Sequence, residues 1–101
     1  MGKEQWESRL AELTKAREGA LVTVEVLDSE YGANEEVERL PFSAAAYDPR
    51  DDVVIISIGG KSPGYPVVLR HMVWHPTEVD VDEKGVKVVE PDGTTTLVAF
   101  Y

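Results

Sequence analysis

Residues 53–63 read VVIISIGGKSP, and the fold depends on whether this strand enters a phosphate-binding loop or a simple corner. A phosphate loop needs a glycine five residues before Gly60 and a helix after Ser62. Position 55 is isoleucine, and two prolines close behind Ser62 prevent a helix from forming there. The stretch therefore predicts a strand over 53–58 and a corner over 60–62 that binds no nucleotide.

The sequence before this stretch predicts one helix followed by strands. Residues 3–18 place Trp6, Leu10 and Leu13 at helical spacing, and Gly19 follows where helices commonly end. Beyond Gly19, apolar and polar residues alternate with the period of two that is typical of strands. The predicted strands cover residues 20–28, 37–46, 53–58, 67–74, 78–82, 86–90 and 95–101, with turns over 29–34 and 48–51 and at Asp92-Gly93.

Two of these strands carry further information about their positions. The strand over 53–58 is almost continuously apolar, which predicts a central strand covered on both faces. Pro41 lacks a backbone N–H, which predicts an edge position for the strand over 37–46.

These elements predict an α+β fold for a chain of 101 residues. The links between strands are too short for parallel crossovers, so the strands form an antiparallel meander. We expect one N-terminal helix packed on an antiparallel meander sheet or an open barrel of six or seven strands. The length predicts a single domain, with the helix over about 3–18 and the β-rich part over 20–101.

The composition excludes several classes of chemistry. The absence of cysteine rules out disulfides, thiolate nucleophiles and cysteine-based metal sites. A net charge of −9 opposes binding to nucleic acid or to anionic membranes. The N-terminus lacks the apolar core of a secretory signal, and the longest aliphatic run covers only residues 53–56. We therefore expect a soluble cytoplasmic protein.

His71 and His75 are spaced like a zinc pair on a helix, but their segment is predicted to be a strand. Four residues along a strand span about 13 Å at ~3.3 Å per residue, which is too far for two ligands of one ion. His71 shares its phase with Val73, so we expect a partly buried, hydrogen-bonded histidine. A calcium loop beginning at Asp80 also fails, because lysine stands at its fifth position and proline at its twelfth.

The acidic turn at Asp48, Asp51 and Asp52, beside Tyr47, has two interpretations. Close carboxylates could bind magnesium or form an acid–base pair. A turn in which Asp48 bonds to its own backbone explains the same residues, and we favour it. No catalytic, cofactor-binding or metal-ligating residue is therefore predicted.

Tyr47, Asp48, His71, Trp74 and His75 are the candidate surface or ligand contacts, with Tyr65 as a further aromatic of interest. Trp74 shares its phase with Arg70 and Met72 on the more polar side of its strand, which could mark a contact patch. The interpretation we favour is that the helix or the other half of a curled sheet covers Trp74.

The order of these landmarks resembles a family of short prokaryotic proteins of unknown function. The matching features are an N-terminal helix with Trp6, Gly19 before the valine-rich strand with Val22 and Val24, the turn Tyr47-Asp48-Pro49, the motif His71-x-Val73-x-x-Pro76, and the closing Asp92-Gly93-x-x-Thr96-Leu97. The resemblance spans nearly the whole chain. It implies no activity, cofactor or functional residue.

The leading functional hypothesis is a non-catalytic binding or assembly module, because no complete catalytic motif is present and a small meander leaves strand edges exposed. Its partner would be an unknown protein or a second copy of the chain. The alternative is a small-ligand or metal-dependent enzyme with a site near His71, His75 and the turn over residues 47–52. That alternative requires strand pairing to bring the turn within reach of a histidine.

Overall fold

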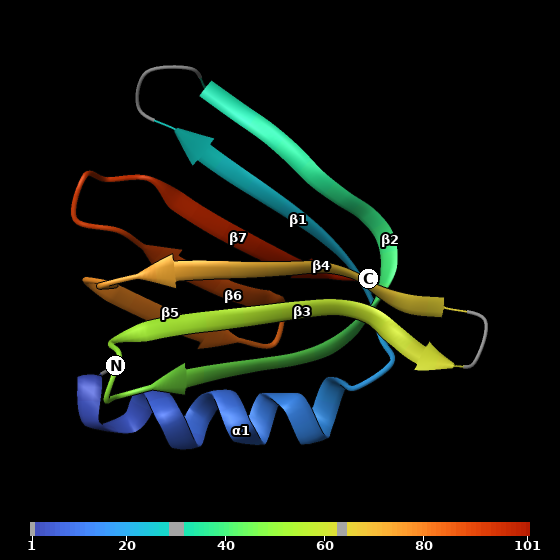
Figure 1. Ribbon diagram of the computed structural model, residues 1–101, viewed down its shortest axis with the longest axis horizontal. Helices are drawn as coiled ribbons and strands as arrows, with labels where there is room; N and C mark the ends of the chain where they lie inside the picture. The colour runs from blue at the N-terminus through green and yellow to red at the C-terminus, as the bar shows by residue number, and fades with distance from the viewer. Residues whose placement is uncertain (1, 29–31, 63–64) are drawn as a thin grey trace.

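The computed structural model describes residues 2–28, 32–62 and 65–101, and the elements in it follow the predicted order. A short 3₁₀ turn precedes one α-helix, and seven strands follow (Figure 1). Their bounds are η1 Lys3–Gln5, α1 Trp6–Arg17, β1 Leu21–Asp28, β2 Gly32–Asp48, β3 Val53–Ser62, β4 Tyr65–Trp74, β5 Glu78–Asp82, β6 Gly85–Val89 and β7 Thr95–Phe100. Residues 29–31 of the predicted turn lie outside the described part.

All seven strands belong to one antiparallel sheet with the order β4-β3-β2-β1-β7-β6-β5. The predicted α+β class is confirmed, and the sheet does not close into a barrel. It curls into two layers, with β3 and β4 in front of β6 and β7 (Figure 1). Two meanders, β1 to β4 and β5 to β7, are joined where β1 pairs with β7.

The long strand β2 belongs to both layers and makes the bend between them. Its first half pairs with β1 as far as Pro41, and its second half pairs with β3 from Phe42 onward. The prediction that Pro41 marks an edge strand is therefore wrong. Pro41 instead lies where β2 changes partner, a position at which a missing N–H costs the sheet little.

Helix α1 closes the edge of the second half of β2. Trp6, Leu10 and Leu13, the predicted apolar stripe, are all buried in the core. The Thr14 hydroxyl accepts a hydrogen bond from the Ala45 N–H at 3.0 Å. Its own proton reaches either the Leu10 carbonyl at 2.9 Å or the Ala45 carbonyl at 3.0 Å. The helix thus supplies the partner that a neighbouring strand would otherwise give to Ala45.

The chain leaving the helix continues this cover along the same edge. Gly19 has a φ of 89°, which turns the backbone out of the helix at little steric cost. The Gly19 N–H then donates to the Phe42 carbonyl at 2.8 Å, and the Phe42 N–H donates to the Ala20 carbonyl at 2.7 Å. The edge of β2 is therefore hydrogen-bonded before its bend, by β1, and after it, by Gly19, Ala20 and the helix.

Strand β3 lies between β2 and β4 as predicted, but its outer face is covered only in part. Val54, Ile56 and Ile58 point into the core and are fully buried. On the outer face, Val53 is buried, whereas Ile55 and Ser57 are partly exposed. The strand runs on to Ser62, and the antiparallel strand β4 begins at Tyr65, so a strand follows where a phosphate loop would need a helix.

Candidate functional site

The turn between β2 and β3 is built by its first aspartate. Asp48 Oδ1 accepts a hydrogen bond from the Arg50 N–H at 2.9 Å, and the Arg50 Nε lies 3.9 Å from the same oxygen. This is the self-bonded turn predicted for Asp48. The carboxylate of Asp48 is therefore occupied by its own loop.

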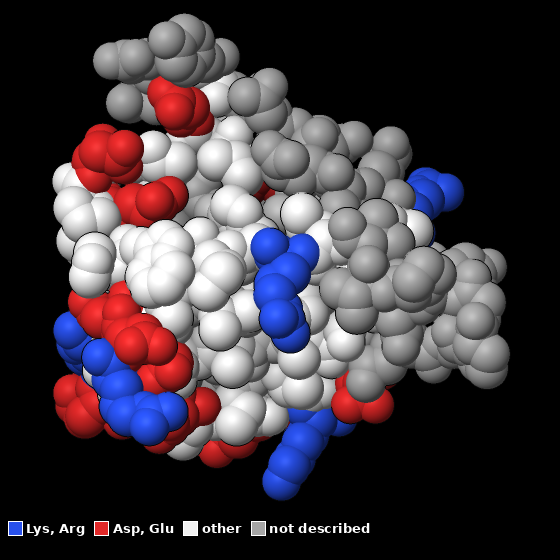
Figure 2. Space-filling view, in the orientation of Figure 1, with Lys and Arg blue, Asp and Glu red and all other residues white. Residues whose placement is uncertain are grey.

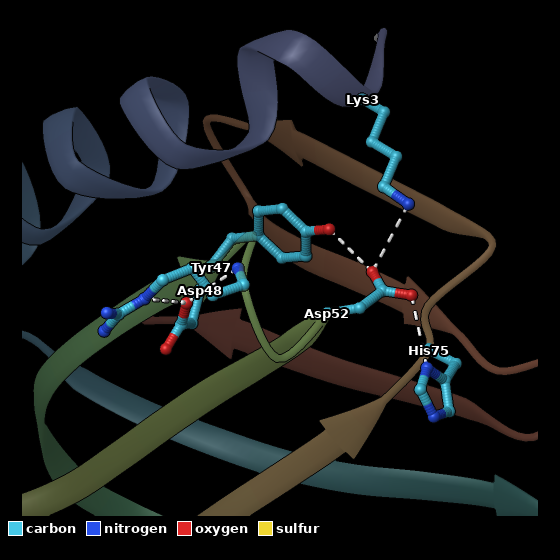
Figure 3. Close-up of polar contacts among 6 residues, drawn as sticks. Lys3, Tyr47, Asp48, Asp52 and His75 are labelled. Carbon is cyan, nitrogen blue, oxygen red and sulfur yellow. Dashed lines mark hydrogen bonds and ion pairs between the residues drawn. The ribbon is translucent and has the colours of Figure 1, made fainter.

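Asp52, at the end of the same turn, is the centre of a polar cluster (Figure 3). Its Oδ1 accepts a hydrogen bond from the Tyr47 hydroxyl at 2.6 Å and lies 3.4 Å from the Lys3 ammonium. Its Oδ2 lies 3.2 Å from His75 Nδ1. One carboxylate thus connects the start of the helix, the β2–β3 turn and the end of β4. We call Lys3, Tyr47, Asp52 and His75 the Asp52 cluster.

The backbone brings Asp52 and His75 together as well. The His75 N–H donates to the Asp52 carbonyl at 2.7 Å, so the two residues form the last rung of the β3–β4 ladder. Both residues have left-handed backbones, with φ of 53° for Asp52 and 54° for His75. Such angles are uncommon outside glycine, and here Asp52 lies immediately before β3 and His75 immediately after β4.

The cluster shifts the pKa values of its members in directions that follow from these contacts. The hydrogen bond from Tyr47 is the largest cause that lowers the pKa of Asp52, and His75 and Lys3 act in the same direction. Burial raises the pKa of Tyr47, and its bond to the carboxylate raises it further. The hydrogen bond to Asp52 raises the pKa of Lys3. The folded state therefore favours an ionised Asp52 beside a neutral Tyr47.

Tyr47 is fixed by packing as well as by hydrogen bonding. Its side chain is only 5% exposed, and its ring meets the Trp6 ring edge to face at 5.2 Å. Lys3 in turn lies over the Trp6 ring, with its ammonium 5.8 Å from the ring centroid. Tyr47 is thus a buried anchor for Asp52, with only its hydroxyl reaching the cluster.

The two histidines lie in different environments. The His71 side chain points between the layers, where its Nε2 lies 3.0 Å from the Thr96 hydroxyl on β7. This agrees with the predicted partly buried, hydrogen-bonded histidine. His75 joins the Asp52 cluster at the surface, where its side chain is 68% exposed. Among the residues that the structure describes, no group of three or more histidine, aspartate or glutamate side chains is arranged to hold a metal ion.

Trp74 is exposed, so the prediction that the helix or the opposite layer covers it is wrong. Its residue is 47% exposed, and Met72, two positions earlier on the same outer face, is 40% exposed. The Trp74 ring lies 6.5 Å from the His75 ring, which places it beside the Asp52 cluster. The helix packs instead against β2, on the other side of β3. The side chain of Tyr65 lies outside the described part of the structure.

Strand pairing therefore joins Tyr47, Asp52 and His75 but leaves out Asp48 and His71. Sequence reasoning missed two residues of this region. Lys3 lies far away in the sequence, and no local pattern signals its contact with Asp52. Met72 could have been found, since its phase is that of Trp74.

The arrangement could orient an imidazole, because a carboxylate on Nδ1 leaves Nε2 facing away as a base or ligand. Catalysis would further require a cavity for a substrate beside it. The structure has a cavity of about 220 Å³ on β5, β6 and β7, between Gly85 and Leu97, and none of the candidate residues lines it. Within the described residues, no helix has the length and apolar character needed to cross a membrane.

Comparison with known proteins places the chain in a family. Residues 1–101 match the model of a family of unknown function, DUF5335. The chain is also 35% identical to an uncharacterized protein of Aquifex aeolicus (strain VF5), in an alignment of 101 residues that covers 95% of this chain and 85% of that protein. No solved structure matches the chain. The predicted resemblance to a short prokaryotic family is confirmed, and the chain belongs to the DUF5335 family of proteins of unknown function.

Proposed function

We propose that this protein is a non-catalytic binding module whose contact surface is the outer side of β4. The observation that carries the proposal is the exposure of Met72 and Trp74 on a strand at the end of the sheet. Large apolar side chains that lie together at a surface often mark contacts with other proteins. Tryptophan in particular is enriched among the residues that dominate binding energy.

The neighbouring strand supports the same surface. Ile55 on β3 pairs with Met72 and lies partly exposed on the same outer face. A strand that carries apolar residues on both of its faces is usually covered on both faces. A partner on the outer face would provide the cover that this sequence pattern predicts.

Charge distribution also supports this surface. Figure 2 shows uncharged surface over the left part of β4, bordered by acidic side chains above and by both acidic and basic side chains below. The chain has a net charge of −9, so the uncharged region is a place where a partner protein can approach with little electrostatic repulsion. A small apolar centre with a charged rim is the usual composition of a protein interface.

Site-specific crosslinking in the native cells tests the proposal. A photoreactive amino acid is placed at position 72 or 74, and as a control at Leu21, which is similarly exposed on β1 at 46%. We expect crosslinked protein species from positions 72 and 74 at several times the yield from position 21. Equal yields from the three positions would contradict a contact surface on β4.

A second candidate, a small-ligand or metal-dependent enzyme, is favoured by one observation. The turn over 47–52 does come within reach of a histidine, with Asp52 Oδ2 3.2 Å from His75 Nδ1. A ligand at a hundred times its Kd adds ~2.7 kcal/mol to stability, which a thermal shift detects. This candidate predicts a shift with a metal ion or nucleotide that is lost in His75→Asn and kept in His71→Asn. No shift with any of them would remove this candidate.

A further inference from the structure

The hydrogen-bonding phase of β4 determines which backbone groups lie at its open edge. In an antiparallel ladder, alternate residues bond to the neighbour, and the others direct their N–H and C=O groups away from it. The bond from the His75 N–H to the Asp52 carbonyl sets this phase, so Val73, His71 and Leu69 bond to β3. The backbone groups of Arg70, Met72 and Trp74 therefore face outward.

The opposite side of this layer supports the assignment. Ala45 lies opposite Ile56 on β3, and Ile56 lies opposite His71 on β4. Because Ile56 bonds to β4, Ala45 must direct its own backbone groups away from β3. It does so, since the Ala45 N–H donates to the Thr14 hydroxyl of the helix, which also lies 3.0 Å from the Ala45 carbonyl. The same phase therefore holds across the whole layer.

The position beyond β4 lies over β1 of the second layer. His71 contacts Thr96, so β4 lies in front of β7, and β1 follows β7 in the sheet order (Figure 1). On the inner face of β1, Val22 and Val24 are fully buried, whereas Val26 is only partly buried. A strand added beside β4 would cover Val26 and extend the front layer.

A second copy of the chain does not fit this position. Two copies paired through β4 would be related by a twofold axis perpendicular to the front layer. In each copy, β1 and the first half of β2 extend past β4 in the layer behind (Figure 1). The rear layers of the two copies would occupy the same space. A single extended segment has no second layer and avoids this conflict.

The charges around the edge give this segment a direction. The acidic side chains above the uncharged surface lie toward the end of β4 that carries Trp74, whereas the border below it holds both acidic and basic side chains (Figure 2). An antiparallel segment would bring its N-terminal end to Trp74 and its C-terminal end to Arg70. Lysine or arginine at the N-terminal end would meet the acidic groups and could stack on the exposed indole of Trp74.

Building on the binding function proposed above, we infer that an extended segment of a partner protein adds to β4 as an antiparallel strand. Its backbone bonds to Arg70, Met72 and Trp74. Alternate side chains are apolar and cover Val26, and basic residues lie at its N-terminal end. Strand addition of this kind takes affinity from main-chain hydrogen bonds and specificity from alternate side chains.

Selection from a phage-displayed library of random peptides tests this inference on the intact protein. Two variants separate backbone from side chain: Met72→Pro removes the outward N–H, and Met72→Ala keeps it while removing the side chain. We expect selected peptides to bind Met72→Pro at least tenfold more weakly than Met72→Ala. We also expect alternating apolar residues and N-terminal lysine or arginine in the selected sequences.

Hydrogen exchange on the wild-type protein provides a readout that does not depend on how well the proline variant folds. In the free protein, the amides of Arg70, Met72 and Trp74 should exchange faster than that of Val73. In the complex with a selected peptide, the three outward amides should slow at least tenfold. Unchanged exchange at all three, or equal binding to both variants, would overturn the inference.

Failure of the inference can be told apart from failure of the binding function. If no peptide is selected while positions 72 and 74 crosslink strongly in cells, strand addition is wrong and the contact surface remains. If the crosslinked species is a second copy, the partner inferred here is wrong. If positions 72 and 74 yield no more crosslinked protein than position 21, the binding function itself fails.

Discussion

The front layer of the molecule has two edges, and their surroundings differ. At the edge of β2, the helix buries Leu10 against the strand, and the Thr14 hydroxyl accepts a hydrogen bond from the Ala45 N–H. At the edge of β4, the outward backbone groups have no neighbouring strand in the described part of the chain, and Met72 and Trp74 are exposed beside them. The fold thus covers one edge and leaves the other open.

The other end of the sheet, at β5, shows that an uncovered edge strand need not pair with a strand of another chain. This strand has five residues, and Glu78 and Asp80 point to solvent, where both approach Lys87 of β6. Short length and charge are known means of discouraging strand pairing. The long, nearly uncharged β4 has neither, which is why we assign binding to β4 and not to β5.

The largest loss of stability should come from proline at a residue of β4 whose N–H bonds to β3. Val73 is fully buried, and its N–H is assigned to the ladder with β3. Val73→Pro removes that bond, leaves a buried carbonyl without a donor and disturbs the core, at a cost of about 4 kcal/mol. Urea unfolding should show this loss. A cost below about 1 kcal/mol would show that the phase assigned to β4 is wrong.

The second largest loss of stability should come from removing the Thr14 hydroxyl at the covered edge of β2. Thr14→Val keeps the shape of the side chain but leaves the Ala45 N–H without its acceptor, which should cost about 2 kcal/mol. Thr14→Ser keeps the hydroxyl and is the matched control, with an expected cost under about 1 kcal/mol. Thermal unfolding of the two variants measures the difference. Equal melting temperatures would mean that the hydroxyl does not stabilise this edge.

The Asp52 cluster ties the two regions together, and its effect should depend on pH. Because folding lowers the pKa of Asp52, its contribution is complete above the unfolded value of about 4 and is lost as the pH falls through the folded value. Asp52→Asn tolerates the left-handed backbone and removes the charge. The stability difference between wild type and Asp52→Asn should therefore shrink as the pH falls below about 4.

Urea unfolding across this pH range provides the measurement, with Asp51→Asn as the control on an exposed neighbour. The difference for Asp52→Asn should depend on pH more strongly than the difference for this control. A difference for Asp52→Asn that stays constant or grows in acid would show that the Tyr47, Lys3 and His75 contacts do not favour the ionised carboxylate.

The sequence predicted the elements well because their causes are local. Helical spacing of Trp6, Leu10 and Leu13 and the alternation in β1 and β5 depend on residues close together in the chain. The position of Pro41 was misjudged, because a strand that changes partner midway offers a proline the same tolerance as an edge.

The site was less predictable, because it depends on pairing between distant segments. Asp52 meets His75 through the β3–β4 register, and Lys3 lies near the N-terminus, far from both residues in the sequence. Trp74 was expected to be covered because indoles usually are. Only the sheet order reveals that β4 is terminal and that the helix lies on the far side of β3.

The smallest change in stability should come from proline at Met72, one residue before Val73. Its N–H faces outward, and proline is tolerated where an edge strand turns its N–H to solvent. We therefore expect Met72→Pro to change the free energy of unfolding by less than about 1 kcal/mol, against about 4 kcal/mol for Val73→Pro. Urea unfolding and near-ultraviolet circular dichroism compare the two variants. If Met72→Pro costs as much as Val73→Pro, the outward amides are already engaged, and β4 cannot be the edge that receives a partner.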